Sequence, residues 1–327
     1  MLIIKPLFRK ALQQMKKQMY FNDMIFLSHG NKIIIKDKEG SKGMKYLTIS
    51  ELGKINYFNL YNRALRHGIH NFYKINSNID CVIIKGKILF YENRNLINTL
   101  EINNGSRPLR KGVVYKEDYI IYSEYYGNKG REPIHVYKYN YINDKKEIVY
   151  TFNDIRHIHF IQEDINNSNY LYIGTGDLDD ECGIYKFDLI NHILQVIGGG
   201  SQMWRAVSLL QTNKFLYWGT DNPSGTNYIM RYNLESNRVE KLQQIDGPAY
   251  YSARAKSNEM YIATTIEDRK RHKAIIYRTL DGQNWDKYLE FKKDALHTKY
   301  FGYGLVEFIN NQEELNELMY NLIGLKE

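Results

Sequence analysis

The chain contains little cysteine and no long apolar stretch. Its two cysteines, Cys81 and Cys182, are too few to form the disulfide framework that stabilises small secreted domains. No stretch approaches the ~18 apolar residues of a membrane-spanning helix, so we expect no membrane span. The segment MLIIKPLFRKALQQMKKQMYF interrupts its apolar residues with charges every few positions and does not resemble a signal peptide. These features predict a cytoplasmic protein, although they leave action outside the cell open.

Tyrosine and positive charge are what the composition has in excess. The 327 residues include 29 Tyr and are 43% hydrophobic, which indicates a folded chain and not a disordered one. Tyrosine favours β-strands, and its hydroxyl suits a surface that binds a polar ligand. The net charge of +8 is compatible with an anionic partner, although chains of this size also carry such a charge without one. The basic residues are spread along the chain without a nucleic-acid-binding module, so we predict no nucleic-acid partner.

The strongest pattern is an internal repeat with a period of roughly 46–48 residues. Successive copies begin at positions 106, 154, 201 and 247, and an earlier copy begins near 66. Each copy has a short strand with a polar head, an aromatic-rich strand such as YLYIGT or FLYWGT, and a polar loop. A third strand then leads through an Asn or Asp turn to a fourth. This period is typical of the four-stranded blades of a β-propeller.

We therefore predict an all-β protein that forms a single β-propeller. It should have about six four-stranded blades, with five or seven as alternatives, because the stretch 40–62 is hard to assign. Strands from both termini should close the ring. The predicted domains are a basic helix or extension over 1–18, the propeller over 19–311, and a C-terminal helix over 312–327. Two stacked β-sandwiches are the alternative fold, but they would not explain the fixed period.

Polar side chains recur at two places in each blade that open on the same face of a propeller, the head of the innermost strand and the loop between the second and third strands. The strand heads carry cations, imidazoles and aromatic rings: Arg66, His70, Arg110, Arg156, His157, His159, Trp204, Arg205, Tyr250, Tyr251, His297 and Tyr300. The loops carry further charged residues: Glu124, Arg131, Asp177 and Asp221. Taken singly, a residue of this kind more often joins two blades or caps a loop than takes part in a functional site. Packing between blades does not require polar residues to recur at these positions. We therefore expect one shared polar site with Arg156, Arg205 and Asp177 close together.

The segment RTLDGQNWDKY, residues 278–288, resembles an Asp-box, with Asp281, Gly282 and Trp285 in the expected places. On this segment and the wider pattern of residues 106–290, the chain resembles the sialidase/BNR-like propeller superfamily, including bacterial glycan-processing members. In sialidases three arginines hold a carboxylate, a tyrosine activated by a glutamate is the nucleophile, and an aspartate is the acid. The resemblance implies the following candidates: Arg66, Arg110, Arg156 and Arg205 as clamps, Tyr250 or Tyr251 near Glu124, and Asp177 as the acid.

The first functional hypothesis is a hydrolase that cleaves an acidic oligo- or polysaccharide. The planar guanidinium of arginine binds a carboxylate through two hydrogen bonds, which explains arginine at the blade heads. Cleavage of a glycosidic bond also needs two carboxyl groups that act as acid and as base or nucleophile. Asp177 with Glu124 or Asp221 are the candidates for this pair.

A polysaccharide lyase and a non-catalytic propeller that binds a glycan or a protein are the alternatives. A lyase needs a histidine or tyrosine base and an arginine that neutralises a carboxylate, and His157, His159, Tyr251 and Arg156 are suited to these tasks. A binding protein would instead use Tyr and Trp to stack on sugars or to anchor a partner. We expect no cofactor; a divalent metal held by His157 and His159, with His297 as a third ligand, remains the alternative.

Overall fold

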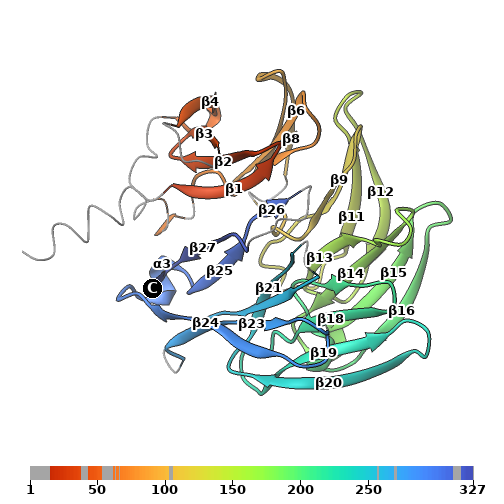
Figure 1. The fold of residues 1–327 in the computed structure, drawn as a ribbon. Coiled ribbons are helices and arrows are strands. Elements are labelled where there is room, and N and C mark those ends of the chain that lie inside the picture. The colour runs from red at the N-terminus through yellow and green to blue at the C-terminus, as the bar shows by residue number, and fades with distance from the viewer. Residues whose placement is uncertain are drawn as a thin grey trace, which may run out of the picture.

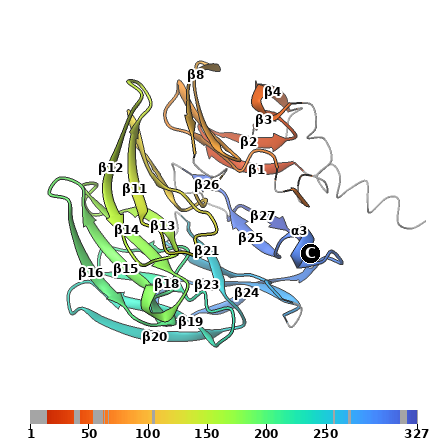
Figure 2. The same ribbon diagram turned by 180° about the vertical axis from the view of Figure 1, so that it is seen from behind.

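The computed structural model is an all-β protein with six four-stranded blades arranged as a β-propeller (Figures 1 and 2). It describes residues 15–37, 43–53, 62, 64–65, 67–102, 106–255, 258–268, 271–311 and 318–326. The predicted fold class is therefore confirmed. Within these residues no helix is long and apolar enough to cross a membrane.

Each blade is an antiparallel sheet whose four strands follow one another along the chain, the first lying innermost. The first three blades are β1 (Lys16–Phe21), β2 (Met24–His29), β3 (Lys32–Asp37) and β4 (Met44–Thr48); β5 (Asn71–Lys74), β6 (Ile79–Ile84), β7 (Lys87–Glu92) and β8 (Asn95–Glu101); and β9 (Val113–Tyr115), β10 (Tyr119–Ser123), β11 (Ile134–Asn140) and β12 (Lys145–Phe152). The next three are β13 (His157–Glu163), β14 (Tyr170–Gly176), β15 (Gly183–Asp188) and β16 (Ile193–Gly199); β17 (Leu210–Gln211), β18 (Phe215–Gly219), β19 (Asn227–Asn233) and β20 (Arg238–Ile245); and β21 (Ala249–Arg254), β22 (Met260–Thr264), β23 (Lys273–Thr279) and β24 (Asp286–Lys293).

Strands from both ends of the chain close the ring, as predicted. The strands β25 (Leu305–Phe308) and β27 (Tyr320–Ile323) pair with each other between the sixth and first blades (Figure 1). The short strand β26 (Asn310–Asn311) pairs in parallel with β1, and β28 (Leu325–Lys326) extends the sixth blade beside β24. The Asn321 side chain accepts a hydrogen bond from Lys17 N at 2.8 Å and donates one to Lys17 O at 2.7 Å, so it acts as a further rung between the termini.

The two predicted terminal extensions need correction where the structure describes them. The helix predicted over 312–327 is wrong for its described part, because Tyr320–Ile323 pairs with the edge of β25 and thereby satisfies its backbone groups within a sheet. At the other end, β1 already begins at Lys16, so the boundary predicted at residue 19 falls inside a strand. The rest of the predicted N-terminal helix, residues 1–14, lies outside the described part of the chain.

The hydrophobic core lies between neighbouring blades. Along β13 the side chains alternate: Phe160 packs against the fifth blade, whereas Ile161 packs against the third. Between the third and fourth strands of four blades, one side-chain oxygen accepts the backbone N–H groups two and three residues further on. The four acceptor residues are Asn140, Asp188, Asn233 and Asp281. In these four blades the repeat read from the sequence therefore ends the third strand in the same kind of turn.

Candidate functional site

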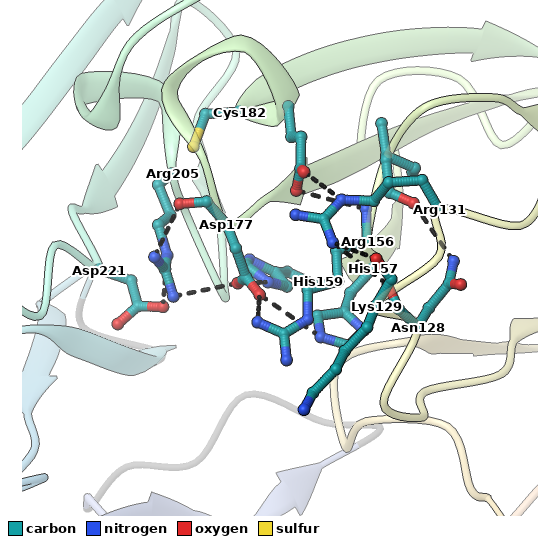
Figure 3. Close-up of polar contacts among 12 residues, drawn as sticks. Asn128, Lys129, Arg131, Arg156, His157, His159, Asp177, Cys182, Arg205 and Asp221 are labelled. Atoms are coloured by element: carbon teal, nitrogen blue, oxygen red, sulfur yellow. Dashed lines mark hydrogen bonds and ion pairs between the residues drawn. The ribbon is translucent and has the colours of Figure 1, made fainter.

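Six polar residues from the fourth and fifth blades meet at one place, and we refer to them as the Asp177 cluster (Figure 3). Its members are Arg156, His157, His159, Asp177, Arg205 and Asp221. They come from two positions in each blade. Some lie at or near the head of the innermost strand, and the others follow the second strand directly, after β14 and after β18. The two positions selected from the sequence are thus brought together.

Asp177 is the centre of this cluster. Its Oδ2 lies 3.0 Å from Arg156 Nη1 and 3.4 Å from His157 Nε2. Its Oδ1 lies 3.1 Å from Arg205 Nη2 and 3.3 Å from His159 Nε2. Arg205 Nη1 also donates a hydrogen bond to the backbone carbonyl of Asp177 at 2.9 Å. The expectation that Arg156, Arg205 and Asp177 lie close together is therefore confirmed.

These neighbours keep Asp177 ionised. Burial alone would raise the pKa of its carboxyl, but the interaction with His159 and the positive charge of Arg205 outweigh burial and hold the pKa below its usual range. A carboxyl with a lowered pKa has no proton to give at neutral pH. The role of general acid that the sequence suggested for Asp177 is thus physically unfavourable, and the side chain instead fixes the groups around it.

His157 is buried and uncharged at neutral pH. Burial lowers its pKa to about 4, although the nearby Asp177 carboxylate acts in the opposite direction. Its ring lies against the ring of Tyr125, with centroids 4.3 Å apart. Burial also raises the pKa of Tyr125, to about 12, so this phenol keeps its proton. Tyr125 was not among the residues selected from the sequence.

The pKa of Asp221 is shifted in the opposite direction from that of Asp177. Its Oδ2 accepts a hydrogen bond from Arg205 Nε at 3.1 Å, while its Oδ1 is buried and has no hydrogen-bond partner within the described residues. Burial raises the pKa of Asp221 well above its usual value, and the negative charges of Glu267 and Asp177 act in the same direction. These effects outweigh the attraction of the single arginine. Oδ1 is therefore the oxygen of Asp221 that is free to carry a proton.

Glu267 is a functional candidate that the sequence analysis missed. It lies in the loop between β22 and β23, which is the same position in the sixth blade that Asp177 and Asp221 occupy in the fourth and fifth. The Tyr250 side chain is hydrogen-bonded to it. Burial raises the pKa of Glu267, and burial together with the charges of Asp221 and Glu267 raises that of Tyr250 well above 10. The loop position was the signal that would have identified this residue.

Arg131 holds a second carboxylate of the fourth blade. Its Nε donates to Glu181 Oε1, and Glu181 Oε2 accepts from the backbone N–H of Arg156 at 3.3 Å. Glu181 is 4% exposed and lies in the short 3₁₀-helix η3 (Asp179–Glu181). This pair fixes the loop that leads into β13, and so it positions Arg156 from its backbone side.

Several predicted site residues lie elsewhere. Glu124 faces Lys146, with Oε1 and Nζ 3.7 Å apart, and acts electrostatically on Tyr122 and Tyr137, so the predicted pairing of Glu124 with Tyr250 or Tyr251 is wrong. The reason is that its side chain leaves the strand toward the outer strands β11 and β12 of its own blade.

Three aromatic candidates are also absent from the cluster. Trp204 is a core residue stacked on Trp218, with ring centroids 5.2 Å apart. His297 accepts a hydrogen bond at the N-terminus of α3 (Thr298–Phe301), and the ring of Tyr300 in the same helix is beside it. Arg66 lies outside the described residues.

The remaining candidates, His70, Arg110 and Tyr251, lie in the region of Glu307 of β25, and Lys16 links His70 to that carboxylate. Arg110 Nη1 lies 3.0 Å from Glu307 Oε1, and the charges of both side chains act on Tyr251. The His70 carbonyl accepts a hydrogen bond from Lys16 Nζ at 3.2 Å. They form a second group of charges near the innermost strands.

The structure does not favour the predicted metal alternative. Within the described residues no group of three or more His, Cys, Asp or Glu side chains is arranged to hold a metal ion. His157 and His159 both direct Nε2 at Asp177, whereas His297 belongs to α3.

Comparisons with known proteins agree with the fold. The extracellular domain of the B. thetaiotaomicron protein described as a hybrid two-component system matches with a TM-score of 0.58 and 13% identity, covering 96% of this chain and 39% of that chain. This chain thus spans well under half of that protein's length. A chain of the mitotic checkpoint complex matches with a TM-score of 0.50 and 14% identity, covering 76% of this chain and 70% of that one. No family model and no curated protein matches the sequence. These similarities support the β-propeller fold alone.

Proposed function

We propose that the protein hydrolyses an acidic glycan at the Asp177 cluster and the adjoining Tyr250–Glu267 pair. One observation carries this proposal: Asp221 and Glu267 are two carboxyl groups near one another, both with raised pKa values, beside an arginine and a tyrosine. Hydrolysis of a glycosidic bond requires a carboxylic acid that still holds its proton and a second group that acts as base or nucleophile. Asp221 supplies the first because its pKa is raised well above the usual value.

Arg156 is the group suited to bind the carboxylate of the sugar. Its side chain is 34% exposed, so one side of the guanidinium reaches solvent while Nη1 is held by Asp177. Arg205 is 15% exposed and bound between Asp177 and Asp221, so it contributes positive charge from within. The fixed orientation of Arg156 offers a planar pair of donors to a ligand without a further loss of side-chain freedom.

In the proposed reaction Tyr250 and Glu267 act together. The Tyr250 oxygen attacks the anomeric carbon while its proton passes to Glu267, and Asp221 Oδ1 gives its proton to the departing glycosidic oxygen. Water then displaces Tyr250 from the sugar, one water proton returns to Asp221, and Glu267 returns the phenolic proton to Tyr250. This arrangement is similar to the tyrosine, glutamate, aspartate and arginine set of sialidases, and the Asp-box-like turn at Asp281 adds to that resemblance.

The experiment is a screen of acidic oligosaccharides read by mass spectrometry, in which hydrolysis adds the mass of water. Asp221→Asn and Glu267→Gln should each reduce turnover by about 10²–10⁴-fold while the variants stay folded by circular dichroism. Asp180→Asn is the matched control, since Asp180 is exposed in the neighbouring loop and should change nothing. Full activity in both Asp221→Asn and Glu267→Gln would refute the assignment.

One observation favours a lyase as the second candidate. His157 is uncharged, lies against Tyr125 and is next to Arg156, which supplies a base, a phenol and a neutralising cation in one place. Elimination would give an unsaturated sugar that absorbs in the near ultraviolet, with no gain of water. Loss of that product in His157→Ala and Tyr125→Phe, with Glu267→Gln unaffected, would support the lyase. Binding of an acidic glycan without any product would support a non-catalytic protein.

A further inference from the structure

Five charged residues near the innermost strands form a second group, which we call the axial cluster: Lys16, Arg107, Arg110, Lys111 and Glu307. Lys16 begins β1, the two arginines and Lys111 precede β9, and Glu307 lies in β25. Glu307 Oε1 lies 2.8 Å from Lys16 Nζ and 3.0 Å from Arg110 Nη1. The cluster therefore joins the closing strands of the ring to the head of the third blade.

Positive charge dominates the axial cluster, because four cationic side chains surround one carboxylate. Burial opposes ionisation of Glu307, but Arg110 and Lys16 outweigh it and lower its pKa, so the carboxylate is already neutralised by two cations. Burial and the charge of Arg110 lower the pKa of Lys111 to about 8, and Glu307 offsets this only in part. A lysine with its pKa lowered in this way gains from any further anion that approaches it.

In and beside the axial cluster, two buried nitrogen atoms have no hydrogen-bond partner within the described residues. Arg110 is 9% exposed, and its Nε has no hydrogen-bond partner within the described residues. The Nε2 atom of His70 is likewise buried without a partner there, and Arg107 Nη1 contacts the other ring nitrogen of His70. Buried donors are nearly always satisfied in native proteins, so these atoms indicate a ligand or solvent position. Solvent reaches the group, since the Lys16 side chain keeps 27% of its surface exposed.

The axial cluster lies beside the Asp177 cluster. Arg107 forms an isolated β-bridge with Tyr125, whose ring contacts that of His157. The charges of Asp177 and Arg156 act on Tyr125 from one side, and those of Glu307 and Arg110 act on Tyr251 from the other. Two phenols thus separate two positively charged places, and aromatic rings with hydroxyl groups are suited to sugar rings.

We propose that the axial cluster is a second anion subsite, so that the ligand is an oligosaccharide with acidic groups on at least two of its units. One acidic group binds Arg156, and the next binds between Lys111, Arg107 and Arg110. This inference rests on the proposed function in that it takes the ligand to be a glycan. It goes further by requiring more than one negative charge along the ligand, which a single acidic sugar does not provide.

The test uses isothermal titration calorimetry with galacturonic acid, its tetramer and inorganic phosphate as probes, in the Asp221→Asn background, in which turnover should be strongly reduced. Lys111→Gln should weaken tetramer binding about tenfold and leave the monomer unchanged, because a charged contact at one subsite is lost. Lys111→Arg is the control that keeps the charge and should retain the affinity. Tetramer affinity should fall more steeply as the pH rises through about 8 with Lys111 present than with arginine there, where only Lys16, whose pKa burial also lowers, still titrates.

Equal weakening of monomer and tetramer by Lys111→Gln, or no effect on the tetramer at any pH, would overturn the second subsite while leaving the proposed function intact. Phosphate binding that Lys111→Gln weakens, without any binding of the tetramer, would overturn the two-unit glycan together with the proposed function. Phosphate binding that responds to Lys111→Gln and competes with the tetramer would support the subsite.

Discussion

Replacing Asp177 by asparagine tests the assignment of this residue as the organiser of its cluster. Asparagine has nearly the same shape, so the change removes the negative charge and leaves the packing in place. The carboxylate is 16% exposed and contacts two guanidinium groups and two imidazoles at 3.0–3.4 Å. The substitution would therefore leave positive charges close together in a partly buried place.

The expected loss is about 3 kcal/mol of unfolding free energy at pH 7, at the lower end of the range for breaking a buried ion pair. Two features of the site keep the expected loss at the lower end of that range. Arg205 retains its contact with Asp221, 3.1 Å away, and the Arg156 side chain is 34% exposed, so water compensates part of its charge. The contribution of Arg156 alone should be no more than about 1 kcal/mol, as for other exposed ion pairs.

The loss should depend on pH with a defined sign. The pKa of Asp177 is lowered in the folded protein, so the unfolded chain binds the proton more tightly. The contribution of the carboxylate is then complete above the unfolded pKa of about 4, and it falls as the pH decreases from there toward the lower folded value. The stability difference between wild type and Asp177→Asn should accordingly shrink as the pH falls below 4.

The assay is urea denaturation followed by circular dichroism at several pH values. Asp179→Asn is the matched control, because Asp179 is exposed in the same loop and its change should stay within about 0.5 kcal/mol. A loss below 0.5 kcal/mol for Asp177→Asn, or a loss that grows as the pH falls below 4, would refute the reasoning.

Three further substitutions test the fold by the same assay. Gly174→Ala should cost about 1–3 kcal/mol, because a Cβ there would lie 2.0 Å from a ring atom of the fully buried Phe160, whereas Gly127→Ala, with nothing within 4 Å, should have little effect. Trp285→Ala should cost about 3–5 kcal/mol, since Trp285 is 6% exposed in the core between the fifth and sixth blades. Asn321→Ala should cost about 1–2 kcal/mol by removing two hydrogen bonds to the β1 backbone.

The ring could be predicted from the sequence because a repeat imposes the same physical demand on each copy. Each second strand must be apolar on both faces, since it lies between two blades, and YLYIGT and FLYWGT meet this demand. The turn oxygens of Asp188 and Asn233 recur for the same reason. The chain ends are not copies of the repeat: Tyr320–Ile323 has a short apolar pattern that suits a helix as well as a strand, and the free edge of β25 decides between them.

The site was predicted in part, and the errors follow from what a repeat does not specify. The period placed Arg156, Arg205, Asp177 and Asp221 on one face, and all four meet in the structure. It does not say whether a side chain turns inward or toward the outer strands, and Glu124 turns outward.

The three carboxyl groups that follow the second strands of the fourth, fifth and sixth blades show why chemistry cannot be read from position alone. Asp177, Asp221 and Glu267 occupy equivalent places, yet two arginines and two histidines surround the first, one arginine faces the second, and a tyrosine faces the third. The pKa of the first is lowered, and burial raises the other two because less positive charge opposes it. For the proposed reaction this difference argues against Asp177 as the acid, since its pKa is lowered, and leaves the acid role to a carboxyl with a raised pKa such as Asp221.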